Sequence, residues 1–166
     1  MTNNLDLSGQ LIGEFYEWFT NNLEKGELLP KVFSGITADK RQFILMMGDL
    51  GIEKGLHLEF MKYVVNQEQV IAFVATMRIN VQLSEEPLQL QERYFFFSGQ
   101  EGSFYSIEVT PKIDWQFGYD ITTNKHTERS HIFFQDLFSE NCDENIKAKY
   151  SDLWANVRDK ILWRER

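Results

Sequence analysis

Glu108 and Asp114 are the side chains of this sequence that could act together as an acid and a base. Apolar and polar residues alternate on both sides of a predicted tight turn at residues 110–112, which would set the two carboxylates across from each other on neighbouring strands. A nearby like charge raises the pKa of a carboxyl group, which suits it to general acid and base catalysis. An acid and base enzyme that uses Glu108 and Asp114 is therefore one hypothesis for this chain.

Other reactive residue types lack the spacing that metal binding or nucleophilic catalysis requires. His57 and Glu59 alternate along one predicted strand, but no third ligand follows at the spacing of a zinc site. Cys142 has acidic neighbours and no adjacent histidine. The glycines form no phosphate loop, and no serine lies in a Gly-x-Ser-x-Gly pattern. We therefore assign no catalytic residue, no metal and no cofactor from the sequence.

The composition of the chain is typical of one globular domain over residues 1–166. Its net charge of −8 argues against a nucleic-acid partner, because lysine and arginine supply that affinity. The longest apolar run, residues 70–75, is far below the roughly 20 residues of a membrane span, and residues 1–6 show no export signal. The single cysteine fits a reducing compartment. We expect a cytoplasmic protein that binds neither nucleic acid nor membranes.

Apolar residues at helical spacing predict three helices. Ser8 can cap the first, over residues 8–26, in which the apolar positions recur every three or four residues. The second is expected to begin at residue 37 or 39 and to end at residue 48 or 51. Asp143 can cap a long amphipathic helix that continues to the arginines at positions 164 and 166.

Between residues 56 and 134 the apolar residues recur with a period of two, most clearly over residues 113–121. This pattern predicts an antiparallel meander of about six strands, in which strands that follow each other in sequence are neighbours in the sheet. The predicted fold class is α+β, with two N-terminal helices, the meander sheet and a C-terminal amphipathic helix packed on one face of it.

One face of the predicted sheet is almost wholly apolar, and the helices should cover it. The opposite face, which we call the mixed face, is charged at one end and aromatic at the other. Its candidate ligand-binding residues are His57, Arg78, Arg93, Glu108, Asp114, Phe95, Phe97 and Phe104. An apolar surface of this kind indicates contact with a second subunit, with the protein's own first helix or with a small molecule.

These features favour a non-catalytic binding or adaptor protein that recognises another protein and forms a homodimer through the mixed face. The alternative is a small-molecule binding protein with a pocket between a curved sheet and a helix. Arg93 would pair with Glu108, and Arg78 beside it would favour an anion, so the ligand would be an amphipathic or aromatic acid. The acid and base enzyme is the third hypothesis.

Overall fold

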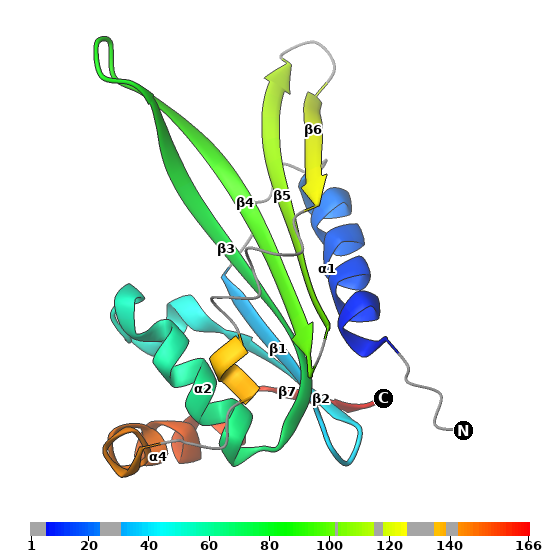
Figure 1. Ribbon diagram of the computed structural model, residues 1–166, viewed down its shortest axis with the longest axis vertical. Coiled ribbons are helices and arrows are strands. Elements are labelled where there is room, and N and C mark those ends of the chain that lie inside the picture. The colour runs from blue at the N-terminus through cyan, green and yellow to red at the C-terminus, as the bar shows by residue number, and fades with distance from the viewer. Residues whose placement is uncertain (1–5, 24–30, 102, 115–117, 126–134, 139–142) are drawn as a thin grey trace.

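The computed structural model describes residues 6–23, 31–101, 103–114, 118–125, 135–138 and 143–166 (Figure 1). Its α-helices are α1 (Leu7–Leu23), α2 (His57–Gln67) and α4 (Glu144–Arg158), and its short 3-10 helices are η1 (Met47–Leu50), η2 (Lys54–Leu56) and η3 (Gln135–Phe138). Its strands are β1 (Val32–Thr37), β2 (Arg41–Met46), β3 (Val70–Ser84), β4 (Gln89–Gln100), β5 (Ser103–Asp114), β6 (Gly118–Lys125) and β7 (Leu162–Glu165). The predicted α+β class with an antiparallel sheet is confirmed.

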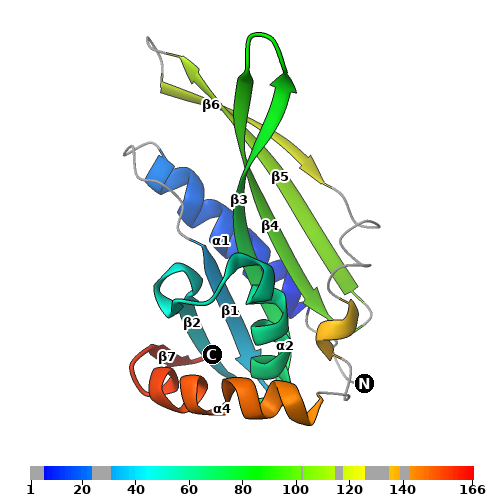
Figure 2. The same cartoon turned by 90° about the vertical axis from the view of Figure 1, so that its left-hand side faces the viewer.

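The described strands form one antiparallel sheet in the order β6-β5-β4-β3-β1-β2-β7. From β3 to β6 each strand pairs with the next one along the chain, as predicted. Two pairings join distant parts of the chain, because β1 also pairs with β3 and the C-terminal strand β7 pairs with β2. Beyond the helices, β3 and β4 continue as a long projecting hairpin (Figure 2).

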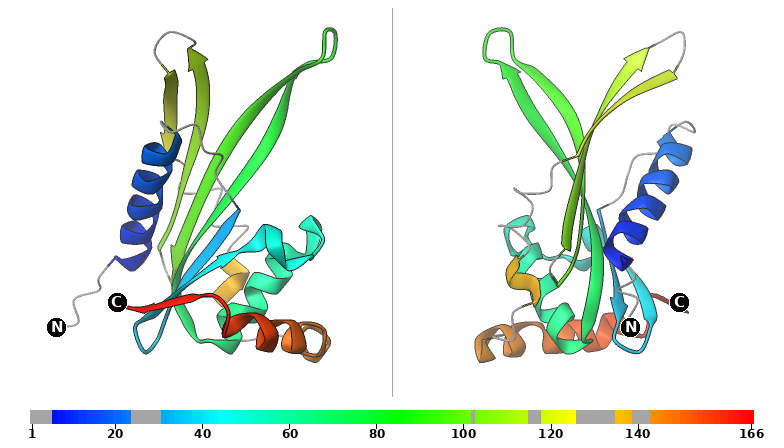
Figure 3. Two further views of the ribbon diagram at one scale, coloured as in Figure 1. Left: turned by 180° about the vertical axis from the view of Figure 1, so that it is seen from behind. Right: turned by 45° about the vertical axis from the view of Figure 1, so that its right-hand side comes forward.

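Helices cover both faces of the sheet (Figure 3). On one face α1 lies over β3, β4 and β5, and its Phe19 ring packs 4.9 Å from Tyr94 and 5.3 Å from Phe96. On the other face α2, η3 and α4 enclose a second core, in which the Trp154 ring lies 5.9 Å from Phe43 and 6.2 Å from Phe60. We call these two sides the α1 face and the α2 face.

The inner strand β1 is buried along all six of its residues, because it lies between β2 and β3 and beneath helices on both faces. Gly35 in this strand lies directly under the ring of Phe43. A Cβ atom at position 35 would come within 2.8 Å of that ring and 3.0 Å of Val70. The glycine is therefore required for close packing rather than for an unusual backbone conformation.

The second predicted helix is wrong, because residues 37–50 form the end of β1, a turn, strand β2 and η1. In this segment Phe43, Leu45 and Met47 are buried at a spacing of two, which is the period of a strand. The first predicted strand is also wrong. Residues 57–67 form α2, whose Phe60, Met61 and Val64 are buried at helical spacing.

The predicted turn at residues 110–112 does not exist, since β5 continues to Asp114 and pairs with β6. The alternating stretch 113–121 is therefore a hairpin in which Ile113 lies opposite Tyr119. These two residues are separated by an even number of positions, so their side chains lie on the same face both in one straight strand and in this hairpin. The alternation of apolar and polar residues therefore does not distinguish the two structures. Residues 115–117 of this stretch lie outside the described part of the chain.

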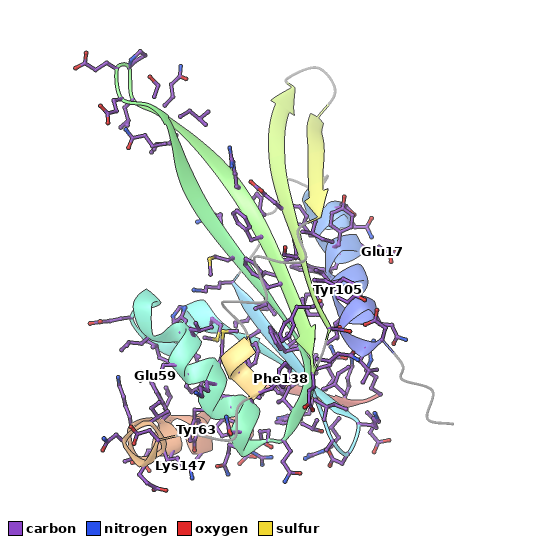
Figure 4. All side chains as sticks on the ribbon, in the orientation of Figure 1. Glu17, Glu59, Tyr63, Tyr105, Phe138 and Lys147 are labelled. Carbon is purple, nitrogen blue, oxygen red and sulfur yellow. The ribbon has the colours of Figure 1, made fainter. Side chains whose placement is uncertain are left out.

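Both terminal helices are confirmed, with changes at their ends. Asp6, rather than Ser8, caps α1, since its Oδ1 accepts from the backbone N–H of Gly9 at 3.1 Å. Asp143 caps α4 as predicted and accepts from the N–H of Asn145 at 3.0 Å. The helix α4 ends at Arg158, and the last residues leave it to form β7. Tyr105 on β5 lies beside α1 (Figure 4), and its hydroxyl hydrogen bond lowers the pKa of Asp6.

The close packing around Gly35 leads to a prediction about paired glycine substitutions. Gly35→Ala should lower the free energy of unfolding by about 1–3 kcal/mol, because the added methyl group pushes against Phe43 and Val70. Gly13→Ala should raise it by about 0.5–1 kcal/mol, because Gly13 is exposed within α1 and has open space around it. Urea denaturation of both variants measures the two changes, and a loss at both positions would contradict this account.

A second prediction concerns the contact between α2 and α4, where the hydroxyl of Tyr150 donates to Glu59 at 2.8 Å (Figure 4 labels Glu59). That hydrogen bond, together with Lys149, lowers the pKa of Glu59 in the folded protein. The contact therefore stabilises the fold fully above the pKa of an unfolded glutamate, about 4.3. This stabilisation is lost as the pH falls through the lower pKa of the folded state. Tyr150→Phe should destabilise the protein by about 1 kcal/mol at pH 7. The loss should shrink below about pH 4. An equal loss at both pH values in urea titrations would show that Glu59 contributes nothing.

Candidate functional site

Five of the eight predicted mixed-face residues do share one face of the sheet. Arg93, Phe95 and Phe97 are at alternate positions of β4, so their side chains point to the same face, the α2 face. On β5, Glu108 lies opposite Phe95 and Phe104 lies opposite Gly99, so these two side chains point to that face as well. The rings of Phe95 and Phe97 are stacked, with centroids 5.9 Å apart and planes inclined by 4°. The predicted ion pair is present as well, since Arg93 Nη1 lies 2.9 Å from Glu108 Oε1.

Arg78 and His57 lie away from this group. The pairing of β3 with β4 differs by one residue from the predicted register, so Arg78 lies opposite Tyr94 and belongs to the α1 face. A shift of one residue exchanges the two faces of a strand. His57 is buried at the start of α2, where its Nε2 lies 3.0 Å from the carbonyl oxygen of Ile52.

The expected pairing of Glu108 with Asp114 is also absent. Glu108 lies opposite Asn124, whereas Asp114 lies opposite Gly118 at the far end of the same strand. Six residues along a strand correspond to about 20 Å, which is too far for one proton-transfer site. The side chain of Asp114 lies outside the described part of the structure.

The aromatic end of the mixed face is partly covered by the protein itself. Phe97 and Phe104 pack against the core of the α2 face, and the ring of Phe138 on η3 lies 6.2 Å from Phe104 (Figure 4). The sequence predicts the first helix as one possible cover of this end, but α1 lies on the opposite face. Among the described residues, η3 covers Phe104 through the ring of Phe138.

A hollow of about 950 Å³ lies on the α1 face beside β2 and the edge strand β7. We call it the edge groove. Its walls are α1, β2, η1, β7 and the end of α4. The apolar lining residues are Phe15, Trp18, Val32, Ile44, Leu45, Met46, Leu50, Val157, Ile161 and Leu162, and the charged ones are Glu14, Asp49, Lys160 and Arg164.

The apolar lining of the edge groove is open to solvent. Trp18 is 41% exposed, Met46 is 42% exposed and Leu162 is 62% exposed, although each is a large apolar side chain. On β2 and β7, Ile44 pairs directly with Leu162, so the two side chains lie next to each other on the α1 face. The exposed residues therefore come from three elements and form one continuous apolar surface.

The buried side chain of Gln42 holds β7 in place beneath the groove. Its Oε1 accepts hydrogen bonds from Arg164 at 2.9 and 3.0 Å and from Arg166 at 2.8 Å, and its Nε2 donates to Ser34 at 2.9 Å. Arg166 also donates to both carboxylate oxygens of Glu14 on α1. This network connects α1, β1, β2 and β7 and so fixes the position of two walls of the groove.

Trp163 anchors β7 on the opposite, α2 face. Its ring lies 5.3 Å from that of Phe43, with the guanidinium groups of Arg41 and Arg158 at 5.0 and 5.4 Å from its centroid. Its indole N–H donates to the carbonyl oxygen of Arg158 at 2.6 Å. The four-residue strand β7 is thus held by side chains on both faces as well as by its pairing with β2.

The charged rim of the groove is unevenly neutralised. Glu14 already binds Arg166 and lies 3.8 Å from Arg164, so its charge is balanced within the protein. Lys160 and Asp49 are exposed at the rim. Lys160 follows the C-terminal end of α4 and, like the half-exposed Arg164, is a rim cation that a ligand can reach from solvent.

The edge groove is not predicted from the sequence, although the position of Trp18 on the first helix points to it. Trp18 belongs to the apolar pattern of the first helix, yet Phe15 and Phe19 already supply that helix with a face toward the sheet. Its exposure shows that the apolar stripe is wider than the sheet contact needs. The wall formed by β7 gave no comparable signal, because its four residues continued the apolar pattern of the preceding helix.

No family model, no curated protein and no solved structure matches this chain. Within the described ranges, no cluster of three histidine, cysteine or acidic side chains could hold a metal ion. Among the same residues no helix is both long and apolar enough to cross a membrane.

The network around Gln42 predicts how β7 responds to its loss. Gln42→Leu keeps the size of the side chain but removes the common acceptor of Arg164 and Arg166. The free energy of unfolding should fall by about 2 kcal/mol, and the amides of residues 162–165 should exchange with solvent about tenfold faster. Gln10→Leu, at an exposed position of α1, is the matched control. Unchanged exchange in β7 would show that Gln42 does not hold the strand.

Proposed function

We propose that this protein is a binding protein that holds an amphipathic ligand, an apolar body carrying an acidic group, in the edge groove. The observation that carries the proposal is the continuous exposed apolar surface of Trp18, Met46 and Leu162 around a hollow of about 950 Å³. Ligand pockets typically measure about 300–1,000 Å³ and combine an apolar lining with a few polar groups. The groove has that size and that composition.

The apolar lining supplies the affinity in this proposal. Each square ångström of apolar surface removed from water contributes about 25 cal/mol, so covering three large side chains favours binding of an apolar chain or ring. The walls come from elements that are already fixed, since β7 is held by Gln42 and Trp163 and α1 by its own core. A site that is formed before binding loses little entropy on ordering.

The charges of the rim determine which polar group the ligand carries. Glu14 is neutralised by Arg166, so Lys160 provides an exposed positive charge next to the apolar lining. An acidic group placed at Lys160 leaves the apolar body of the ligand over Leu162. A cationic ligand of the same length would be repelled by Lys160, and Asp49 at the rim would offset only part of that repulsion.

The other two hypotheses have weaker support. Self-association through the mixed face requires Phe97 and Phe104 to be available, but both pack partly against the protein's own core. The acid and base enzyme requires Glu108 and Asp114 to meet, and the strand register separates them. The net charge of −8 and the single cysteine support a cytoplasmic binding protein whose ligand is not a nucleic acid.

Calorimetric titration with decanoate tests this proposal, with decyltrimethylammonium as a probe of equal chain length and opposite charge. Decanoate should bind more tightly than the cation. Leu162→Glu should weaken decanoate binding about tenfold or more, because it places a charge in the apolar lining. Lys160→Gln should weaken it about threefold.

Leu58→Glu is the matched control, because Leu58 is 41% exposed on α2 and does not line the groove. It should leave decanoate binding unchanged. Equal decanoate affinity in the native chain and in Leu162→Glu would contradict the proposed site.

A further inference from the structure

The tip of the β3–β4 hairpin lies at the end of the molecule farthest from β7 (Figures 1 and 2), and it carries exposed apolar side chains. Leu83 is 53% exposed, Leu88 is 64% exposed and Leu90 is 59% exposed. Isolated leucines on a surface are common, but three within eight residues at the end of a projecting hairpin indicate a contact.

The tip also carries negative charge. Glu85 and Glu86 are exposed between Leu83 and Leu88, so the tip is an apolar segment with adjoining carboxylates. This is the chemistry that the edge groove is proposed to bind, with an apolar lining beside Lys160 and Arg164. The tip is therefore a ligand of the proposed class that the chain itself contains.

We infer that the hairpin tip of one copy of this protein docks in the edge groove of a second copy. The inference rests on the proposed function, since it names an occupant for the same groove. The tip and the groove lie toward opposite ends of the sheet (Figure 1), so a chain does not fill its own groove. Leu88 would enter the lining beside Leu162, and Glu85 and Glu86 would face Lys160 and Arg164.

Such a contact joins two different surfaces, so its symmetry is head to tail. After the first contact one copy still has a free groove and the other a free tip, so the assembly grows into rings or chains rather than stopping at a dimer. This differs from a dimer through the mixed face, in which both copies use the same surface. The mass of the assembly in solution therefore distinguishes the two arrangements.

A membrane is a weaker candidate for the occupant of the tip. Residues 83–90 contain two glutamates and neither an aromatic nor a basic residue. Membrane-binding segments use lysine and arginine toward anionic lipids and tryptophan or tyrosine at the interface. The carboxylates of the tip instead complement the rim of the groove.

Light scattering during size-exclusion chromatography, at protein concentrations up to about 1 mM, tests the inference. The molar mass of the native chain should rise with concentration beyond that of a dimer. Leu88→Glu places a charge in the apolar surface of the tip, and Leu162→Glu places one in the apolar lining of the groove, so each substitution should abolish one side of the contact. Each variant alone should remain a monomer, and Leu58→Glu should associate like the native chain. Circular dichroism checks that each variant is folded, which is expected because all three positions are exposed.

The decisive sample is an equimolar mixture of Leu88→Glu and Leu162→Glu. The first variant has an intact groove and the second has an intact tip, so the mixture should form a dimer and nothing larger. A mixture that stays monomeric, or association that survives in either variant alone, would overturn the inference. Excess decanoate should dissociate the native assembly.

The outcomes also separate this inference from the proposed function. A native chain that is monomeric at every concentration but binds decanoate in the groove would overturn the docking of the tip and leave the proposed function standing. A native chain that neither associates nor binds decanoate would overturn both. Binding of the tip to vesicles of anionic phospholipid, with no association between copies, would assign the leucines to a membrane and overturn the inference.

Discussion

A single antiparallel sheet that is buried on both faces at its centre is the constraint on which the rest of this structure depends. The strand β1 is buried along its whole length, so helices must cover it on each side. A helix is about 10 Å wide and strands are spaced about 4.8 Å apart, so one helix covers two or three strands. In the described part of the chain, α1 is the helix that lies over β3, β4 and β5 on the α1 face, and β2 and β7 extend beyond it. The edge groove follows from this incomplete cover.

The same constraint explains the polar network beneath the groove. Gln42 lies on the α1 face of β2 and is fully buried, and a buried amide is costly unless its atoms are hydrogen bonded. The arginines of β7 satisfy its oxygen, and Arg166 continues the network to Glu14 on α1. The C-terminal strand is therefore part of the fold and also a wall of the groove. Because those walls are fixed by this polar network and by Trp163, the apolar lining residue Leu162 remains exposed.

The sequence predicted the features that depend on local spacing. The terminal helices followed from the apolar spacing of residues such as Leu11 and Phe19 and from the cap at Asp143. The predicted ion pair of Arg93 with Glu108 is also present. The observed register of β4 and β5 differs from the predicted register by two residues, and a shift of two leaves every side chain on the same face. The shift of one residue between β3 and β4 reversed the face of Arg78.

The failures have physical reasons of two kinds. Short apolar runs fit both periods, so residues 41–46 resembled a helix and residues 57–63 resembled a strand until tertiary packing decided between them. The pairings of β1 with β3 and of β2 with β7 join residues far apart in the chain, and no local pattern specifies them. The edge groove depends on both pairings, and for that reason the sequence alone did not reveal it.

The central claim is that the edge groove is a binding site, and the indole N–H signals of the tryptophans in a ¹H–¹⁵N spectrum test it most directly. Trp18 is 41% exposed at the groove, whereas Trp154 is 2% exposed in the core of the α2 face. A Trp18→Phe spectrum assigns the reporter signal. Addition of decanoate should move the Trp18 signal progressively and leave that of Trp154 in place. A stationary Trp18 signal during a titration that does produce binding heat would contradict the claim, because the ligand would then occupy another site.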